Sequence, residues 1–191
     1  TDRNERRKRG LGEPQRMARL EDTAARANSM FGSGADWIDF ETTVSTSGDQ
    51  IALAPGYLQK SWKKNGRNYY HYKMDRKMMP FFAYLSASWE VKKGEWNGMP
   101  IEVYYDRKHG YNIDRMIDAT RKSLDYFTTR FTPYQHKQVR ILEFPNYQRF
   151  AQSFANTIPF SESIGFIADL RKKEDIDYVF YVTAHEMAHQ W

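Results

Sequence analysis

The chain has 191 residues, of which 40% are hydrophobic and 16% aromatic, and its formal net charge is +5. This composition is sufficient for a hydrophobic core and is not typical of a disordered chain. Cysteine is absent, which excludes disulfide bonds and thiolate metal sites, and no apolar run approaches the roughly eighteen residues of a membrane-spanning helix.

Residues 1–35 form a basic, polar segment that ends in a flexible join at residues 31–34. Residues 1–30 hold eight Lys and Arg against five Asp and Glu, so 8 − 5 = +3 of the total charge lies there and the rest of the chain is nearly balanced. We interpret the segment as a solvated linker. A juxtamembrane stretch attracted to anionic lipid and a nucleic-acid-binding arm are the two alternatives.

Residues 36–110 have the pattern of short strands joined by turns. Alternation of apolar and polar residues predicts strands over 37–44, 50–53, 81–91 and 101–105. The pair Asn65-Gly66, between aromatic residues, predicts a β-hairpin because both residues tolerate positive φ. We expect the aromatic side chains of this region in the core of an antiparallel sheet and not on a nucleic-acid surface.

The period of the pattern changes after residue 110. Asn112 is a candidate N-cap, and apolar residues recur at steps of three and four up to Phe131, which predicts an amphipathic helix that ends before Pro133. The sequence then predicts, in order, a strand over 137–144, a loop over 146–160, a strand over 164–170 and a final helix. These elements indicate the α+β fold class.

The final residues contain the pattern H-E-x-x-H, formed by His185, Glu186 and His189. On a helix the two imidazoles lie on one face and can reach one metal ion, and Glu186 can act on a water that the metal activates. The alternative is a buried helix whose histidines bond to neighbouring carbonyl groups. The remaining histidines have no ligand-type spacing, and we expect them to be exposed or hydrogen-bonded: His71, His109 and His136.

A catalytic zinc site normally takes three protein ligands, and the motif supplies two. We therefore expect the chain to stop inside its active site and to have little activity by itself. With the order of the elements before it, the motif resembles the gluzincin aminopeptidases, which are alanyl-aminopeptidase-like zinc exopeptidases. Within that family, residues 47–52, 101–105 and 150–154 resemble bacterial membrane proteins in which the peptidase domain follows an ABC-transporter-type permease.

The resemblance covers residues 36–191. It implies that residues 36–110 are the end of an N-terminal antiparallel β-sandwich and that residues 111–191 begin a thermolysin-like catalytic domain. It also implies one Zn²⁺ ion held by His185, His189 and a Glu beyond the chain, with Glu186 as the catalytic base. A Tyr that stabilises the tetrahedral intermediate in the family would also lie beyond Trp191.

Family members carry Gly-Ala-Met-Glu-Asn about two dozen residues before the zinc helix, and its Glu binds the free amino group of the substrate. The corresponding residues 159–163 read Pro-Phe-Ser-Glu-Ser, so only Glu162 is kept. The resemblance thus implies that Glu162 holds the N-terminus of a peptide substrate, since a carboxylate pairs with an ammonium group.

Two other functions remain open. The changed neighbours of Glu162 suggest a transporter-associated ligand-binding or structural module with degenerate peptidase activity, and a zinc endopeptidase would cut N-acetylated peptides as well as free ones. The resemblance further implies a parent protein at the bacterial cell membrane, fused to or associated with a permease, in which this part is soluble. We expect no nucleic-acid partner.

Overall fold

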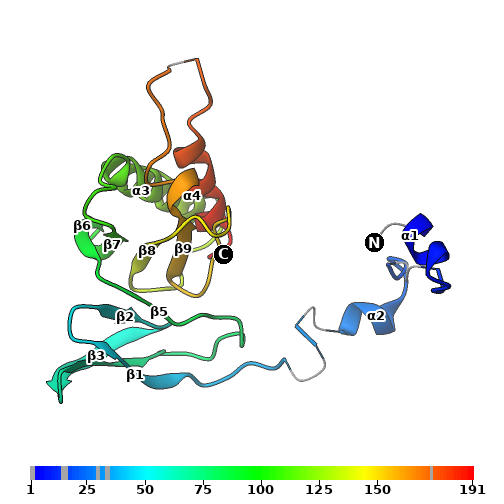
Figure 1. Ribbon diagram of the computed structural model, residues 1–191, viewed down its shortest axis with the longest axis horizontal. Helices are drawn as coiled ribbons and strands as arrows, with labels where there is room; N and C mark the ends of the chain where they lie inside the picture. The colour runs from blue at the N-terminus through cyan, green and yellow to red at the C-terminus, as the bar shows by residue number, and fades with distance from the viewer. Residues whose placement is uncertain (1–2, 14–16, 29–30, 33–34, 173) are drawn as a thin grey trace. The chain divides into compact units, whose positions relative to one another are not determined.

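The computed structural model describes residues 3–13, 17–28, 31–32, 35–172 and 174–191. It divides into two compact units, Thr1–Asp36 and Trp37–Trp191. The first unit contains two short helices, α1 (Arg3–Lys8) and α2 (Thr23–Ala27), and neither has a buried residue (Figure 1). The predicted join at 31–34 lies partly outside the described residues. Within the described ranges, every helix is too short or too polar to cross a membrane.

The second unit has an α+β fold, as predicted. Its first sheet is antiparallel and has the strand order β1 (Glu41–Ser47), β4 (Arg67–Lys73), β3 (Tyr57–Lys64). A two-stranded antiparallel sheet pairs β2 (Ile51–Leu53) with β5 (Leu85–Ala87). The third sheet has the order β6 (Glu90–Trp96), β7 (Met99–Tyr105), β8 (Val139–Phe144), β9 (Thr157–Ser161). In this sheet β6 is antiparallel to β7, while β7, β8 and β9 are parallel.

The predicted hairpin is confirmed between β3 and β4. Asn65 and Gly66 have φ values of 49° and 73°, the left-handed conformation that a tight hairpin turn requires. The strand predicted over 81–91 is interrupted, because β5 pairs with β2 whereas β6 pairs with β7. The chain therefore changes sheets between Ala87 and Glu90.

Two longer helices, α3 (Ile113–Arg130) and α4 (Tyr178–Ala188), lie side by side and pack on the four-stranded sheet (Figure 1). Helix α3 connects the parallel strands β7 and β8, as such a pair requires. Every residue of β8 and β9 is buried. The core between the helices and this sheet includes Val103, Met116, Leu124, Ile141, Phe160, Val179 and Met187.

Two predictions after α3 were wrong. The predicted loop over 146–160 contains most of β9, and the predicted strand over 164–170 is a short 3₁₀ helix, η1 (Glu162–Ile164), followed by turns. Asn112 explains the second difference. Its side-chain amide donates to Gly165 O at 2.8 Å and to Ala168 O at 2.9 Å, so these carbonyl groups are satisfied without a neighbouring strand.

The predicted boundary at residue 110 falls between β7 and α3, and the four-stranded sheet contains strands from both sides of it. Arg140 on β8 also joins the two sides. Its guanidinium is buried and donates to Ala54 O at 2.6 Å and to Thr157 Oγ1 at 2.7 Å. Residues 37–191 consequently form one unit in the structure.

Candidate metal centre

The motif lies at the end of α4, which begins where Asp177 accepts a hydrogen bond from Phe180 N at 2.9 Å. The helix has one buried face and one exposed face. His185 and His189 lie on the exposed face, one turn apart, next to Tyr181. The buried face is formed by Val179, Val182, Thr183, Glu186 and Met187.

The two imidazoles converge. Their Nε2 atoms are 3.2 Å apart, and the ring centroids are 4.8 Å apart with an interplanar angle of 82°. Two nitrogen ligands at tetrahedral zinc, each 2.0–2.1 Å from the ion, lie about 3.3 Å from each other. His185 and His189 therefore fit one zinc ion, although the same spacing also allows one neutral imidazole to donate to the other.

The structure does not support the alternative in which these histidines bond to carbonyl groups. Both residues are exposed, and within the described part of the chain the only side-chain hydrogen bond of either imidazole is the one that joins them. Their nitrogen atoms are thus available to an ion.

Glu186 lies on the buried face of the helix and is only 6% exposed. Burial raises the pKa of its carboxyl, and the nearby His189 and His185 offset this in part. Among the described residues, no hydrogen bond or ion pair engages this carboxylate. A buried carboxylate without a protein partner, beside two candidate ligands, is suited to proton transfer.

The end of the motif is fastened to the amino end of β9 by Gln190, a buried residue. Its Oε1 accepts from Asn156 N at 2.9 Å, and its Nε2 donates to Phe154 O at 2.9 Å and to the Ser153 hydroxyl. Trp191 Nε1 donates to the carbonyl of Thr132 at 2.8 Å. The position of His189 is therefore fixed relative to the sheet.

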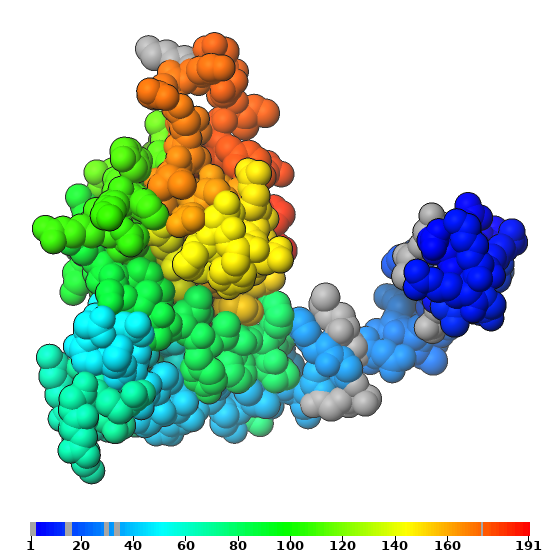
Figure 2. All heavy atoms as spheres, in the orientation of Figure 1, coloured from blue at the N-terminus to red at the C-terminus, as the bar shows by residue number. Residues whose placement is uncertain are grey.

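Residues 150–154 run antiparallel to β9 at the edge of the sheet. Gln152 N donates to Pro159 O and Ser161 N donates to Phe150 O, each at 3.0 Å. The chain around residue 150 lies at the surface in Figure 2, where it is yellow. A cavity of about 120 Å³ separates this segment from neighbouring loops, and its lining includes His189, Gln190, Ser153, Phe154, Met74 and His136.

Glu162 and the attachment point of the motif lie at opposite ends of β9. Glu162 follows the carboxyl end of β9, whereas Asn156, which binds Gln190, precedes its amino end. Five residues of strand span about 17 Å. Across the described residues, no hydrogen bond or ion pair links Glu162 to His185, Glu186 or His189.

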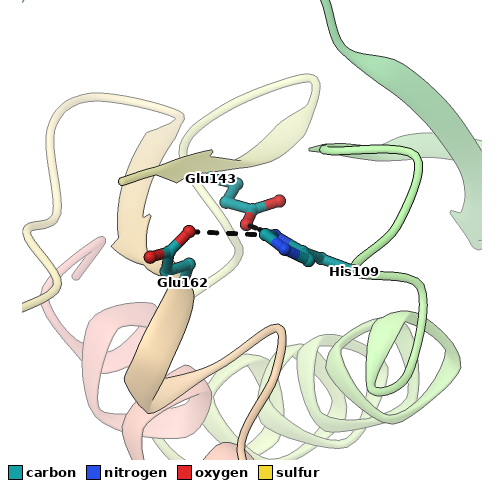
Figure 3. Close-up of side chains that lie close together, drawn as sticks. All are labelled: His109, Glu143 and Glu162. Atoms are coloured by element: carbon teal, nitrogen blue, oxygen red, sulfur yellow. Dashed lines mark hydrogen bonds and ion pairs between the residues drawn. The ribbon is translucent and has the colours of Figure 1, made fainter. Parts of the chain in front are cut away.

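Glu162 lies instead beside His109 and Glu143 (Figure 3). His109 Nδ1 is hydrogen-bonded to Glu143 Oε1 and lies 3.8 Å from Glu162 Oε2. The hydrogen bond to Glu143 raises the pKa of His109. Burial raises the pKa of Glu143, and hydrogen bonds from Asp106 N and His109 offset this in part.

Sequence reasoning missed this cluster, because its members are 34 and 19 positions apart and show no ligand spacing. One signal was available. His109 and Glu162 follow the ends of β7 and β9, and Glu143 lies near the end of β8. Had these strands been recognised as parallel neighbours, the carboxyl ends would have been expected to meet.

His136 also differs from expectation. It is 8% exposed, and its buried Nδ1 has no hydrogen-bond partner among the described residues. Burial lowers its pKa to about 4. This imidazole is therefore neutral at pH 7, on the wall of the cavity that His189 also lines.

The chain matches no protein-family model, and comparison with curated proteins gives no match.

Proposed function

We propose that this chain carries the zinc-binding helix of a metallo-aminopeptidase, in which His185 and His189 bind the metal and Glu186 is the general base. The 3.2 Å separation of the two Nε2 atoms is the observation that carries the proposal, because it fits two ligands of one tetrahedral ion. The resemblance to gluzincins places a third ligand, a Glu, on a following helix.

A bound zinc ion supplies Lewis acidity to the scissile carbonyl and to water. The roles of the chain's own residues follow from their positions. Glu186 accepts a proton from the attacking water and returns it to the leaving amine.

The edge segment 150–154 supports a peptide substrate. It runs antiparallel to β9 through isolated bridges at the border of the sheet, and Gln190 is hydrogen-bonded to it. An extended peptide can pair with such an edge through its main chain and so lie alongside His189. The adjoining cavity could receive an apolar side chain against Met74 and Phe154.

The preference for a free N-terminus rests on the resemblance alone. The role predicted for Glu162 as anchor of the substrate's amino group stays a prediction, and its contacts with His109 and Glu143 favour a different role. The attachment to a membrane permease likewise stays a prediction.

The proposal is tested by hydrolysis of aminoacyl-arylamides by the full-length protein that carries this chain, with N-acetylated analogues as controls. We expect cleavage of the free substrates that a chelator abolishes and that Zn²⁺ restores. Equal cleavage of acetylated substrates would support an endopeptidase. Absence of cleavage, with zinc bound, would support the ligand-binding or structural module.

A further inference from the structure

The carboxyl ends of the three parallel strands gather a second set of metal-ligating side chains. His109 lies in the loop after β7, Glu143 is the next-to-last residue of β8, and Glu162 follows β9 directly. In open α/β sheets, ligands bind beyond the carboxyl ends of parallel strands. The cluster thus occupies the edge of the sheet at which a ligand is expected, and the motif lies at the opposite end of β9.

Backbone groups hold the two carboxylates in place. Glu143 Oε2 accepts from Asp106 N at 2.6 Å, and Glu162 Oε1 accepts from Asn146 N at 3.1 Å. In each case the other carboxylate oxygen is turned toward His109 Nδ1, as Figure 3 shows. One ligand atom from each residue then lies within 4.8 Å of the other two. Hydrogen bonds of this kind orient the ligands of metal sites.

The cluster also has too little positive charge to neutralise its two carboxylates. Glu143 is 5% exposed, and Glu162 and His109 are each 24% exposed. Within the described ranges, His109 is the only ion-pair partner of either carboxylate, and Asp106 adds another acid to the wall of the same cavity. Partly buried carboxylates are costly unless they are paired or bind a metal. A divalent cation would neutralise the carboxylates of both Glu143 and Glu162.

We propose that His109, Glu143 and Glu162 bind a divalent first-row transition-metal ion, at a centre separate from the H-E-x-x-H motif. One imidazole and two carboxylates suit Zn²⁺ or Co²⁺ better than Ca²⁺ or Mg²⁺, which favour oxygen ligands alone. The adjoining cavity of about 170 Å³ has room for water to complete the coordination. The ion would join three segments that meet only in the folded protein. The proposal does not rest on the proposed peptidase function.

The test replaces the two histidines of the motif and measures the metal binding that remains. In the chain with His185→Ala and His189→Ala, we expect one equivalent of Co²⁺ to bind, read by calorimetry and by the cobalt absorption spectrum. Both replaced residues are exposed, so the fold should persist, and circular dichroism checks this. Adding His109→Gln or Glu162→Gln should weaken this binding at least tenfold.

The chain offers a matched control in the first sheet. His71 and Glu41 also form a partly exposed imidazole–carboxylate pair, with Nε2 and Oε1 2.8 Å apart, and among the described residues no second carboxylate pairs with this ring. His71→Gln and Glu41→Gln should leave Co²⁺ affinity unchanged. The unaltered chain provides a second measurement, in which Glu162→Gln should weaken Co²⁺ binding at this centre by the same factor.

Two results would overturn the proposal. One is a folded His185→Ala, His189→Ala variant that binds no Co²⁺ or Zn²⁺. In that case the cluster is only an ion pair with a neighbouring acid. The other is binding that His109→Gln and Glu162→Gln leave unchanged, which would place the ion elsewhere.

Discussion

The two ends of strand β9 differ in how their candidate metal ligands are brought together. At the amino end, His185 and His189 come from one helix, so a spacing of four residues fixes their geometry. At the carboxyl end, three segments supply His109, Glu143 and Glu162, and only the parallel order of β7, β8 and β9 makes them neighbours. A local motif can be recognised in sequence, whereas a site built by topology becomes visible only in the fold.

The largest effect is expected at the motif. Glu186→Gln should lower kcat for aminoacyl-arylamide hydrolysis by about 10²- to 10⁴-fold, because an amide cannot accept the proton of the attacking water. Zinc content, measured by mass spectrometry, should not change, since Glu186 is not a ligand. Activity within threefold of the unaltered full-length protein would remove Glu186 from the role of base.

Unlike His109, His136 is buried and, in the part of the chain that the structure describes, forms no ion pair with a carboxylate. Its pKa is about 4 in the folded protein and ordinarily 6.5, so the unfolded chain binds more protons between these values. Stability should fall as pH falls through 6.5 and should level off below 4. This difference in pKa corresponds to a loss of about 3 kcal/mol in the free energy of unfolding.

Urea unfolding at several pH values measures this loss. The His136→Gln variant should show a shallower dependence in the same window, whatever its stability at pH 7. An unchanged dependence would mean that His136 is protonated in the folded state.

The attachment of the motif to β9 should make a smaller contribution. Gln190→Ala removes the acceptor for Asn156 N, which leaves this buried donor unpaired, and removes one of the two donors to Phe154 O. We expect a loss of about 2 kcal/mol in the free energy of unfolding, measured in urea. Gln59→Ala, an exposed glutamine on β3, is the control and should cost less than about 0.5 kcal/mol. Equal losses of stability in the two variants would mean that the hydrogen bonds of Gln190 do not stabilise the attachment of helix α4 to β9.

Glu162→Gln separates the two roles considered for that residue. As a ligand of the cluster, its loss should weaken Co²⁺ binding about tenfold and leave KM for free aminoacyl substrates unchanged. As an anchor for the substrate's amino group, its loss should raise that KM about tenfold and leave Co²⁺ binding intact. Steady-state kinetics and cobalt titration of the same variant therefore decide whether Glu162 is a metal ligand or an anchor for the substrate's amino group.

Local patterns predicted much of the fold. The Asn65-Gly66 turn follows from positive-φ residues, helix α3 from a 3.6-residue period and helix α4 from the H-E-x-x-H motif, and each of these depends on near neighbours in the chain. Strand β9 could not be predicted in this way. It contains Pro159 and is short, and it is paired on its two sides by β8 and the edge segment 150–154.

The apolar residues 164–170 were predicted to form a strand, but they do not form one. Their pattern resembles a strand, but Gly165 packs where a Cβ would lie 2.5 Å from Phe160 and 2.6 Å from Met116, and Asn112 binds the nearby carbonyl groups. Both features involve residues distant in sequence, Met116 and Asn112. The same dependence kept the His109 cluster out of the sequence-based predictions.

Anomalous diffraction at the zinc edge, from crystals grown with Zn²⁺, shows whether the motif histidines share one ion. We expect a peak about 2.1 Å from the Nε2 atoms of both His185 and His189, and a second peak among His109, Glu143 and Glu162. If no peak lies between the two motif imidazoles, or if the ion contacts only one of them, the assignment of the motif as a zinc centre is contradicted.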